Sequence, residues 1–249
     1  MPSTRLDLPA RVLVSGAAGG IGGAVGRKLI DAGSTVIGTD RGAQPAGWSG
    51  RWIAADLSDP SAPATIAAGL VDEIDGVVLA AGVLDSASWD TIDAEAAHRL
   101  LAINLVAPYF LVRELLPRLS PSATVVFLGS IAGLRSSPAT PFYAASKAAV
   151  RNLASSLGAL LQPQGIRINV VAPGLIDTPL TDALNVTLAG RRGLTPDAVA
   201  AERAAAIPAG RAGSPDEVAD ACLYLLSAQS SYVSGSTLFV AGGVLSGTT

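Results

Sequence analysis

The alternation of short apolar runs with longer segments of helical period constrains the fold more than any other feature of this sequence. Strand-length apolar runs lie at 11–15, 35–39, 76–80, 124–128, 166–171 and 237–240, and helical segments at 23–32, 94–119, 144–161 and 215–226. Strands that alternate with helices are joined by right-handed crossovers and form a parallel sheet with helices on both faces. We therefore predict an α/β fold with a doubly wound parallel sheet of about seven strands.

A single domain is expected over 1–249, because 249 residues that are 49% hydrophobic can bury one large core. No repeat, charge block or flexible linker divides the chain. The least regular stretch, 176–213, has proline-containing breaks and weak amphipathic runs. We interpret it as short helices that form a mobile lid over a site.

Charge and composition argue against several classes of protein. The net charge is -3 and no basic cluster is present, so we expect no nucleic-acid partner. The N-terminal region has no long apolar segment, which predicts a cytoplasmic protein without a membrane anchor. The single cysteine, Cys222, reads as a buried core thiol, and the single histidine, His98, as a surface or packing residue. Without a His/Cys pair, no metal site is predicted.

A glycine-rich turn, residues 16–23, joins the first strand to a helix. Glycine permits positive φ and lets the backbone approach a pyrophosphate, and the helix N-terminus offers free N–H groups. A tight turn without a ligand is the alternative, and the G-x-x-x-G-x-G spacing differs from G-x-G-x-x-G. Because of its place between strand and helix, we interpret the turn as a dinucleotide site formed by Gly16, Gly19, Gly20, Ile21 and Gly22.

Acidic residues follow the next two strands. Asp40 lies 18 residues beyond Gly22; its carboxylate could bind both ribose hydroxyls of adenosine and repel the extra phosphate of NADP, which favours NAD as the cofactor. Arg41 could pair with that phosphate, so NADP stays open as the less favoured cofactor. Asp56, followed by Leu57, could meet the adenine amino group or cap a helix.

Tyr143 and Lys147 stand at i and i+4 of a helical segment. On one helical face, an ammonium near the phenol favours phenolate and lowers the tyrosine pKa from about 10. A tyrosine that acts as general acid/base on an alcohol oxygen requires such a lowered pKa. The pair alone occurs by chance in many helices, but Ser130, which follows a strand 13 residues upstream, makes the pattern specific.

Over essentially its whole length the chain resembles the short-chain dehydrogenase/reductase family, whose members have a single-domain Rossmann fold. The resemblance is carried by SGAAGGIG, by Ser130 with Tyr143 and Lys147, and by Asn104 in LLAINLVAP. It implies that Tyr143 exchanges the proton and that Ser130 hydrogen-bonds the substrate oxygen. It further implies that Lys147 tunes Tyr143 and holds the nicotinamide ribose, and that Asn104 anchors a water linking Lys147 to solvent.

Two further segments match the family. Pro173 and Gly174 follow a strand, and the resemblance implies that Ile176 and Thr178 contact the nicotinamide carboxamide; an ordinary Pro-Gly turn is the alternative. The family's Asn-Asn-Ala-Gly segment is replaced by LAAG at 79–82. The asparagine side chain that steadies the sheet is thereby lost at Ala80, although the backbone through Ala81 and Gly82 can still pass the adenosine.

We predict an NAD-dependent oxidoreductase that transfers a hydride between nicotinamide and a secondary alcohol or ketone. A catalytically idle NAD-binding regulatory or structural homologue remains an alternative, as does an epimerase or dehydratase of the same fold, for which the chain has no spare length. SGAAGGIG, AADLSD and DGVVLAAG resemble bacterial 3α-hydroxysteroid dehydrogenase/carbonyl reductases. The candidate substrate-pocket residues are mostly apolar and favour a hydrophobic or alicyclic substrate, such as a hydroxysteroid or dihydrodiol: Leu84, Leu134, Phe142, Leu175, Leu180 and Leu184.

The resemblance also implies a homo-oligomer, either a dimer or a tetramer. Segments 94–119 and 144–161 are rich in alanine and leucine. Such segments suit a flat interface of helix on helix.

Overall fold

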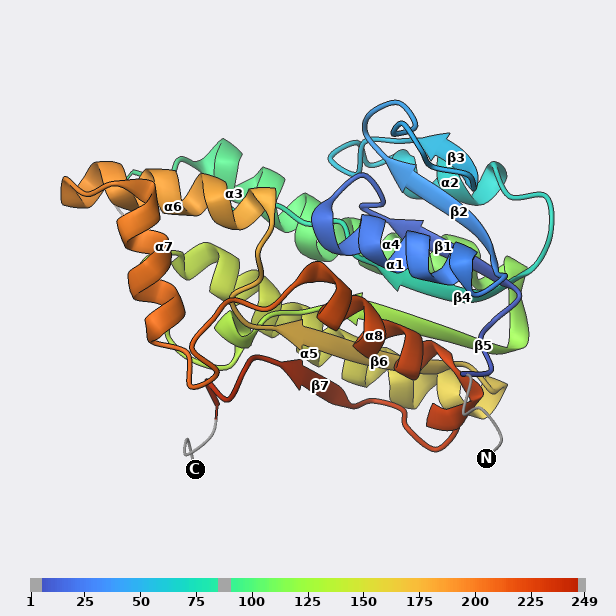
Figure 1. Cartoon of the computed structure of the whole chain (residues 1–249). Coiled ribbons are helices and arrows are strands. Elements are labelled where there is room, and N and C mark those ends of the chain that lie inside the picture. The colour runs from blue at the N-terminus through green and yellow to red at the C-terminus, as the bar shows by residue number, and fades with distance from the viewer. Residues whose placement is uncertain (1–5, 85–90, 246–249) are drawn as a thin grey trace, which may run out of the picture.

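The computed structural model describes residues 6–84 and 91–245. Its sheet has the strand order β3-β2-β1-β4-β5-β6-β7, and all neighbouring strands are parallel (Figure 1). The strands are β1 (Arg11–Ser15), β2 (Thr35–Asp40), β3 (Arg51–Ala54), β4 (Ile74–Leu79), β5 (Leu119–Leu128), β6 (Arg167–Pro173) and β7 (Thr237–Val240). The predicted doubly wound parallel sheet of seven strands is confirmed.

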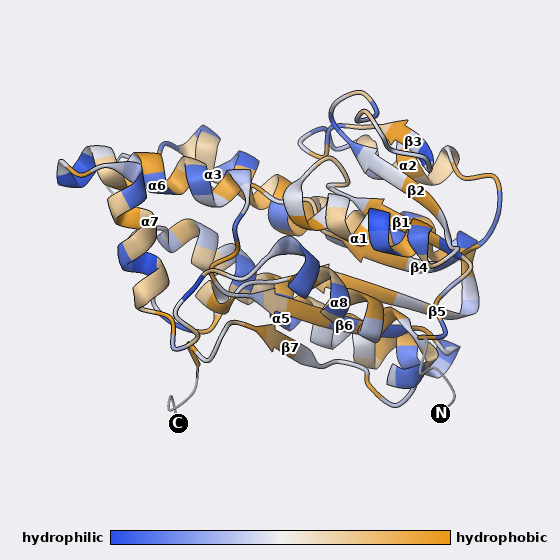
Figure 2. Ribbon diagram, in the orientation of Figure 1, coloured by the Kyte–Doolittle hydropathy of each residue, from blue (hydrophilic) through white to orange (hydrophobic). Residues whose placement is uncertain are grey.

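Helices cover both faces of this sheet. They are α1 (Gly20–Asp31), α2 (Ala62–Ala68), α3 (Ala94–Leu101), α4 (Ala107–Leu115), α5 (Pro141–Leu161), α6 (Pro179–Arg192), α7 (Pro196–Ala205) and α8 (Pro215–Leu226). One apolar core joins the sheet to α1 and α8, and a second joins it to α2, α4 and α5. Figure 2 shows the apolar strands between these helices. Burial on both faces explains why the strands are continuous apolar runs and not alternating ones.

β5 begins earlier than its apolar run predicts. The run starts at Thr124, but the strand starts at Leu119, which pairs with Ile74 of β4. The register shifts between Ile74 and Gly76, so the polar start of β5 is accommodated by a bulge. The helical segment expected to reach residue 119 therefore ends at Arg118, in a short 3-10 turn (Leu116–Arg118).

A continuous helical segment, Ala94–Arg118, contains α3, a π-helical turn (Ala102–Val106) and α4. Within the described ranges it is the one helix long and apolar enough to cross a membrane. Its buried leucines, among them Leu111 and Leu115, belong to the core beneath the sheet, where α4 packs against α2. Packing in the core accounts for the apolar character of this helix.

The stretch interpreted as a lid contains α6 and α7, drawn in orange beyond the end of β6 in Figure 1. Its two ends are joined by a parallel bridge between Ile176 and Gly213. The Asp177 N–H donates to the Gly213 carbonyl at 2.9 Å, and the Gly213 N–H donates to the Leu175 carbonyl at 2.9 Å. The short helices are as expected, and their movement as a lid stays a prediction.

Candidate active site

The carboxyl ends of β1, β4, β5 and β6 meet at one edge of the sheet, where the strand order reverses between β1 and β4. Ligands of doubly wound folds bind in the crevice at such a reversal. Two pockets lie there and share Ala80 and Gly82. The small pocket, of about 230 Å³, lies beside β2, and the large pocket, of about 840 Å³, reaches under α6 and α7. The larger volume suits a substrate together with part of a cofactor.

The glycine turn after β1 is shaped by two close backbone approaches. Gly16 has a φ of +70°, and a Cβ there would lie 2.5 Å from the Ala81 nitrogen. At Gly22, a Cβ would lie 2.2 Å from the Gly16 carbonyl oxygen. Gly19 is the N-cap of α1, and no side chain caps the first turn. The turn therefore leaves a helix N-terminus open to an anion, a donor set that fits a pyrophosphate.

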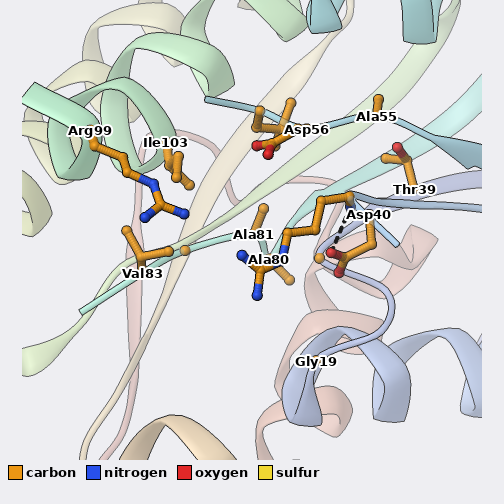
Figure 3. Close-up of a pocket in the computed structure, with 14 residues that line it drawn as sticks. Gly19, Thr39, Asp40, Ala55, Asp56, Ala80, Ala81, Val83, Arg99 and Ile103 are labelled. Carbon is orange, nitrogen blue, oxygen red and sulfur yellow. Dashed lines mark hydrogen bonds between the residues drawn. The ribbon is translucent and has the colours of Figure 1, made fainter. Parts of the chain in front are cut away.

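Asp40 lies at the end of β2 and lines the small pocket, as Figure 3 shows. One carboxylate oxygen accepts a 3.2 Å hydrogen bond from the Ala18 N–H, and the other accepts a 2.8 Å bond from the Arg41 N–H. These bonds connect the glycine turn to β2. They orient the carboxylate at the place where the ribose hydroxyls of an adenosine would bind.

Asp56 also lines the small pocket. It accepts hydrogen bonds from the Ser58 N–H (2.9 Å) and the Ser58 hydroxyl (2.8 Å). These bonds, together with the nearby charges of Arg41 and Arg99, lower the pKa of Asp56. The alternative that Asp56 caps a helix is wrong, because Ser61 is the N-cap of α2 and Asp56 closes a turn before it.

Sequence reasoning missed Arg99. Arg99 lies in α3 and Ile103 in the π-helical turn that follows it. In Figure 3, both lie on the side of the small pocket opposite Asp40. The two residues are four apart in a helix, and this spacing is the one signal that could have grouped them. The small pocket is therefore lined by two arginines, Arg41 and Arg99, and by two acidic residues, Asp40 and Asp56.

Tyr143 and Lys147 lie in α5, and Ser130 follows β5; all three line the large pocket. Ser130 lies close enough to the Tyr143 hydroxyl to lower the tyrosine pKa. Ser130 is held in place because its hydroxyl accepts a 3.1 Å hydrogen bond from the Ala132 N–H. The helical spacing and the serine after the strand thus bring together the three side chains that the sequence grouped.

The pKa of Tyr143 differs from the expectation. Burial raises the pKa above its usual value of 10.0, and the nearby Ser130 side chain opposes that rise. Lys147 was expected to lower the tyrosine pKa, but its Nζ lies 5.7 Å from the ring centroid and donates to the Leu128 carbonyl at 2.9 Å. Burial also lowers the pKa of Lys147 to about 8. Loss of solvent around the phenol therefore outweighs the ammonium in this structure.

Asn104 lies in the π-helical turn and is almost fully buried. Its amide accepts a 2.9 Å hydrogen bond from the Val83 N–H and donates one of 2.9 Å to the Val83 carbonyl. It also donates to the Ser146 hydroxyl at 3.2 Å. Asn104 lines neither pocket. The geometry gives it a positioning function between β4 and α5, and the predicted water link to Lys147 stays a prediction.

Most of the predicted cofactor residues line the two pockets. In the small pocket these are Gly16, Gly19, Asp40, Arg41, Asp56, Leu57, Ala80, Ala81 and Gly82. In the large pocket they are Ile21, Ala80, Gly82, Tyr143, Lys147, Pro173, Gly174, Ile176 and Thr178. Gly20 and Gly22 line neither, because Gly20 faces the Thr178 side chain and Gly22 packs against Gly16. Both glycines therefore allow close packing around the turn and do not line a pocket.

The structure brings together some of the predicted substrate residues and not others. Four of them line the large pocket: Leu84, Leu175, Leu180 and Leu184. Phe142 does not line the pocket, because the residue next to Tyr143 points to another side of α5, and it is 38% exposed. Leu134 does not line it either; it ends the short turn Ile131–Gly133, which packs against α5. Sequence reasoning missed Arg135 and Arg203, which do line this pocket.

The remaining candidate residues stand apart from the pockets. Cys222 is fully buried, as predicted, and burial raises the pKa of its thiol to about 12. His98 is exposed on α3. In the part of the chain that the structure describes, no three His, Cys, Asp or Glu side chains gather to hold a metal ion.

A doubly wound sheet with a glycine turn after β1 and a Ser–Tyr–Lys group beyond β5 defines an oxidoreductase of the short-chain dehydrogenase/reductase class. The chain matches the family model described as "Enoyl-(Acyl carrier protein) reductase" over residues 16–245. A short-chain dehydrogenase family protein from Francisella tularensis subsp. tularensis SCHU S4 has a similar structure, with a TM-score of 0.90, 30% identity and coverage of 94% of this chain and 98% of that one. The chain belongs to the short-chain dehydrogenase/reductase family.

Named relatives differ in substrate. The 3-oxoacyl-[acyl-carrier-protein] reductase FabG of Vibrio cholerae is 31% identical over 252 residues, which cover 96% of this chain and 99% of that protein. A cis-4-hydroxycyclohexanecarboxylate dehydrogenase of Sinomonas cyclohexanicum is 34% identical over 246 residues, which cover 93% and 94%. A gluconate 5-dehydrogenase structure from Beutenbergia cavernae, described as putative and NAD(P)-dependent, contains bound NADP; it has a TM-score of 0.84, 30% identity and coverage of 94% and 96%.

Proposed function

We propose that this chain is a dehydrogenase/reductase that interconverts a secondary alcohol and a ketone with a nicotinamide cofactor. The observation that carries the proposal is the grouping of Ser130, Tyr143 and Lys147 in one pocket, which also reaches Ile21 at the start of α1, the helix that follows the glycine turn. Each group has a chemical use in alcohol oxidation. A catalytically idle homologue would have no need to keep them together.

The proposed reaction divides between cofactor and protein. The bound nicotinamide supplies the chemistry of hydride exchange with the carbinol carbon. Ser130 and Tyr143 hydrogen-bond the substrate oxygen, and Tyr143 takes its proton during oxidation or returns it during reduction. Burial holds the Tyr143 pKa above its usual value, so the phenol is neutral and suited to donating its proton when a ketone is reduced. In the oxidation direction, the positive charges of Lys147 and of the bound nicotinamide would lower this pKa so that the phenolate can accept the proton. Lys147, with a pKa of about 8, exchanges protons near neutral pH and holds the ribose next to the nicotinamide.

NAD is the cofactor that we propose. Support comes from Asp40, whose carboxylate is oriented by two backbone N–H groups at the wall of the small pocket. A carboxylate there would bind ribose hydroxyls and repel a 2′-phosphate. Arg41 and Arg99 line the same pocket and supply positive charge that NADP would use. NADP use is therefore part of the experiment below.

The proposed substrate is a hydrophobic or alicyclic alcohol or its ketone. Leu175, Leu180 and Leu184 line the large pocket and would contact an apolar ring. The Sinomonas relative is named for a cyclohexane substrate. The FabG relative is named for an acyl thioester substrate, so hydroxyacyl thioesters are tested too. The narrower likeness to 3α-hydroxysteroid dehydrogenase/carbonyl reductases stays a prediction.

We also propose a cytoplasmic homo-oligomer, a dimer or a tetramer. The support is the family membership and the presence of exposed apolar side chains on α4 and α5. These side chains include Tyr109 on α4 and Leu160 on α5. Light scattering of the purified protein would give its mass in solution.

The function is tested by NAD and NADP reduction with alicyclic alcohols, hydroxysteroids, cis-dihydrodiols, hydroxyacyl thioesters and sugars. Tyr143→Phe should lower turnover by about 100- to 10,000-fold without weakening cofactor binding, since it removes only the proton-exchanging hydroxyl. Tyr232→Phe is the matched control, because Tyr232 is fully exposed. Unchanged turnover in Tyr143→Phe would remove Tyr143 from the mechanism. Cofactor binding without turnover of any alcohol would favour the idle homologue.

A further inference from the structure

The charged residues of the large pocket have one sign. Lys147, Arg135 and Arg203 line it, and no acidic side chain is among its described lining residues. The whole chain, by contrast, has a net charge of -3. A pocket lined by cations in an acidic protein attracts an anionic ligand.

Arg203 is the notable cation of the three. It lies on α7, is half-buried, and donates from Nη1 to the side-chain oxygen of Asn185, which is buried on α6. Within residues 6–84 and 91–245, no carboxylate forms an ion pair with it. The neighbouring lid arginine, Arg192, does pair with Glu202 at 2.7 Å. Arg203 is thus oriented by a neutral amide that leaves its charge uncompensated.

An uncompensated guanidinium is costly to bury. Burial lowers the pKa of Arg203, and no nearby acid offsets that effect. Arginine nevertheless stays charged in proteins, so a half-buried position without an anion is unfavourable unless a ligand supplies one. The planar guanidinium has five N–H donors, and a carboxylate can accept two of them in parallel.

The other two cations have different surroundings. Lys147 is buried and donates to the Leu128 carbonyl beside the proposed catalytic tyrosine. Arg135 is exposed to solvent, where a charge contributes less to binding. The lining also includes apolar side chains, among them Leu184 and Ile207. The pocket therefore combines a proton-exchanging end, an apolar wall and one half-buried cation.

We propose that the substrate carries a carboxylate and that Arg203 binds it. This inference rests on the proposed function, and it narrows the substrate class to an apolar hydroxy acid or keto acid. The alcohol carbon lies at Tyr143, the apolar body contacts the leucines, and the carboxylate pairs with Arg203. Arg203 is in this way a specificity-determining residue of the lid.

The alternative is a structural role, in which Arg203 only joins α7 to α6 through Asn185. Arg203→Gln separates the two, because glutamine keeps an N–H donor for Asn185 and loses the charge. Arg192→Gln is the matched control, since it removes a charge from the same lid at a residue that does not line the pocket.

The first experiment compares 3- and 4-hydroxycyclohexanecarboxylate with the corresponding neutral amides. Arg203→Gln should lower kcat/KM for the carboxylates by about 10- to 100-fold, mainly by raising KM. A fold-change of this size corresponds to the loss of a charge-assisted hydrogen bond. Turnover of the amides should stay within about threefold, and Arg192→Gln should change neither. An equal loss for carboxylates and amides would show a structural role and overturn the proposal. So would equal rates in Arg203→Gln and the unmodified protein.

A binding experiment separates this inference from the proposed function. Titration calorimetry with cyclohexanecarboxylate and cyclohexanecarboxamide needs no turnover. The unmodified protein should bind the carboxylate about tenfold more tightly than Arg203→Gln does, and the amide equally in both. If no alcohol is oxidised but this difference appears, the proposed function fails and the carboxylate site stands. If alcohols are oxidised without the difference, the site fails and the function stands.

Discussion

The Lys147 ammonium donates a 2.9 Å hydrogen bond to the backbone carbonyl of Leu128, the last residue of β5. The bond connects α5 to the strand end that carries Ser130. It therefore helps to set the separation of Ser130 and Tyr143. It also explains how a lysine that is only 5% exposed keeps a polar partner.

The buried position of Lys147 predicts a pH-dependent stability. Burial lowers its pKa from 10.5 to about 8. Between these values the unfolded chain holds a proton that the folded protein has released, so the free energy of unfolding rises with pH. From pH 7 to 9, the unmodified protein should gain about 1 kcal/mol relative to Lys147→Met, measured by urea unfolding. Lys28→Met, which removes the other lysine of the chain, should show the same gain in stability as the unmodified protein. If Lys147→Met also showed this gain, Lys147 would not be the titrating group.

Asp40→Asn should shift cofactor preference towards NADP. The substitution removes the charge and keeps one acceptor oxygen, so one of the two backbone N–H groups loses its partner. It leaves Arg41 and Arg99 free to attract a 2′-phosphate. The ratio of kcat/KM for NAD to that for NADP should fall by at least about tenfold, the effect of losing a charged hydrogen bond. Asp59→Asn is the control, because Asp59 lies outside the pocket. An unchanged ratio would show that Asp40 does not contact the ribose.

Gly22→Ala should destabilise the protein and weaken cofactor binding. Its Cβ would lie 2.2 Å from the Gly16 carbonyl oxygen, a backbone atom that moves only with the whole turn. We expect a loss of about 1 to 3 kcal/mol in urea unfolding, typical of overpacking.

Gly190→Ala is the matched helix control. Nothing lies within 4 Å of a Cβ at Gly190 in α6, so alanine there should stabilise by about 0.5 to 1 kcal/mol. Equal stability of the two variants would mean that the turn relaxes around Gly22 without strain.

Asn104→Ala should lower stability through the backbone of Val83. Both the Val83 N–H and its carbonyl are paired with the Asn104 amide, and the substitution leaves these groups without that partner. An unsatisfied buried group costs about 1 to 3 kcal/mol, which urea unfolding resolves. Asn152→Ala, at an exposed position of α5, should have almost no effect. A loss below about 0.5 kcal/mol for Asn104→Ala would mean that solvent replaces the amide.

Local patterns predicted the scaffold and the proposed reacting groups. A glycine turn between strand and helix depends on neighbouring residues, and so does the spacing of Tyr143 and Lys147 on α5. Apolar runs located six of the seven strands; they did not include β3, and they missed the start of β5, where pairing with β4 extends the strand through polar residues. Such pairing is a long-range effect that periodicity does not encode.

The sequence by itself determined the order of elements, the layered architecture and the Ser–Tyr–Lys group, because these follow from periodicity, turn chemistry and helical spacing. Only the tertiary structure decided which side chains complete the pockets and what the surroundings do to their charges. Arg99 and Arg203 reach the pockets from helices distant in sequence from the glycine turn and from Tyr143. Phe142 turns away, and burial reverses the expected direction of the Tyr143 pKa shift. Whether a side chain faces a cavity, and whether it is shielded from solvent, depends on how the crossover helices pack. This packing is a property of the assembled fold.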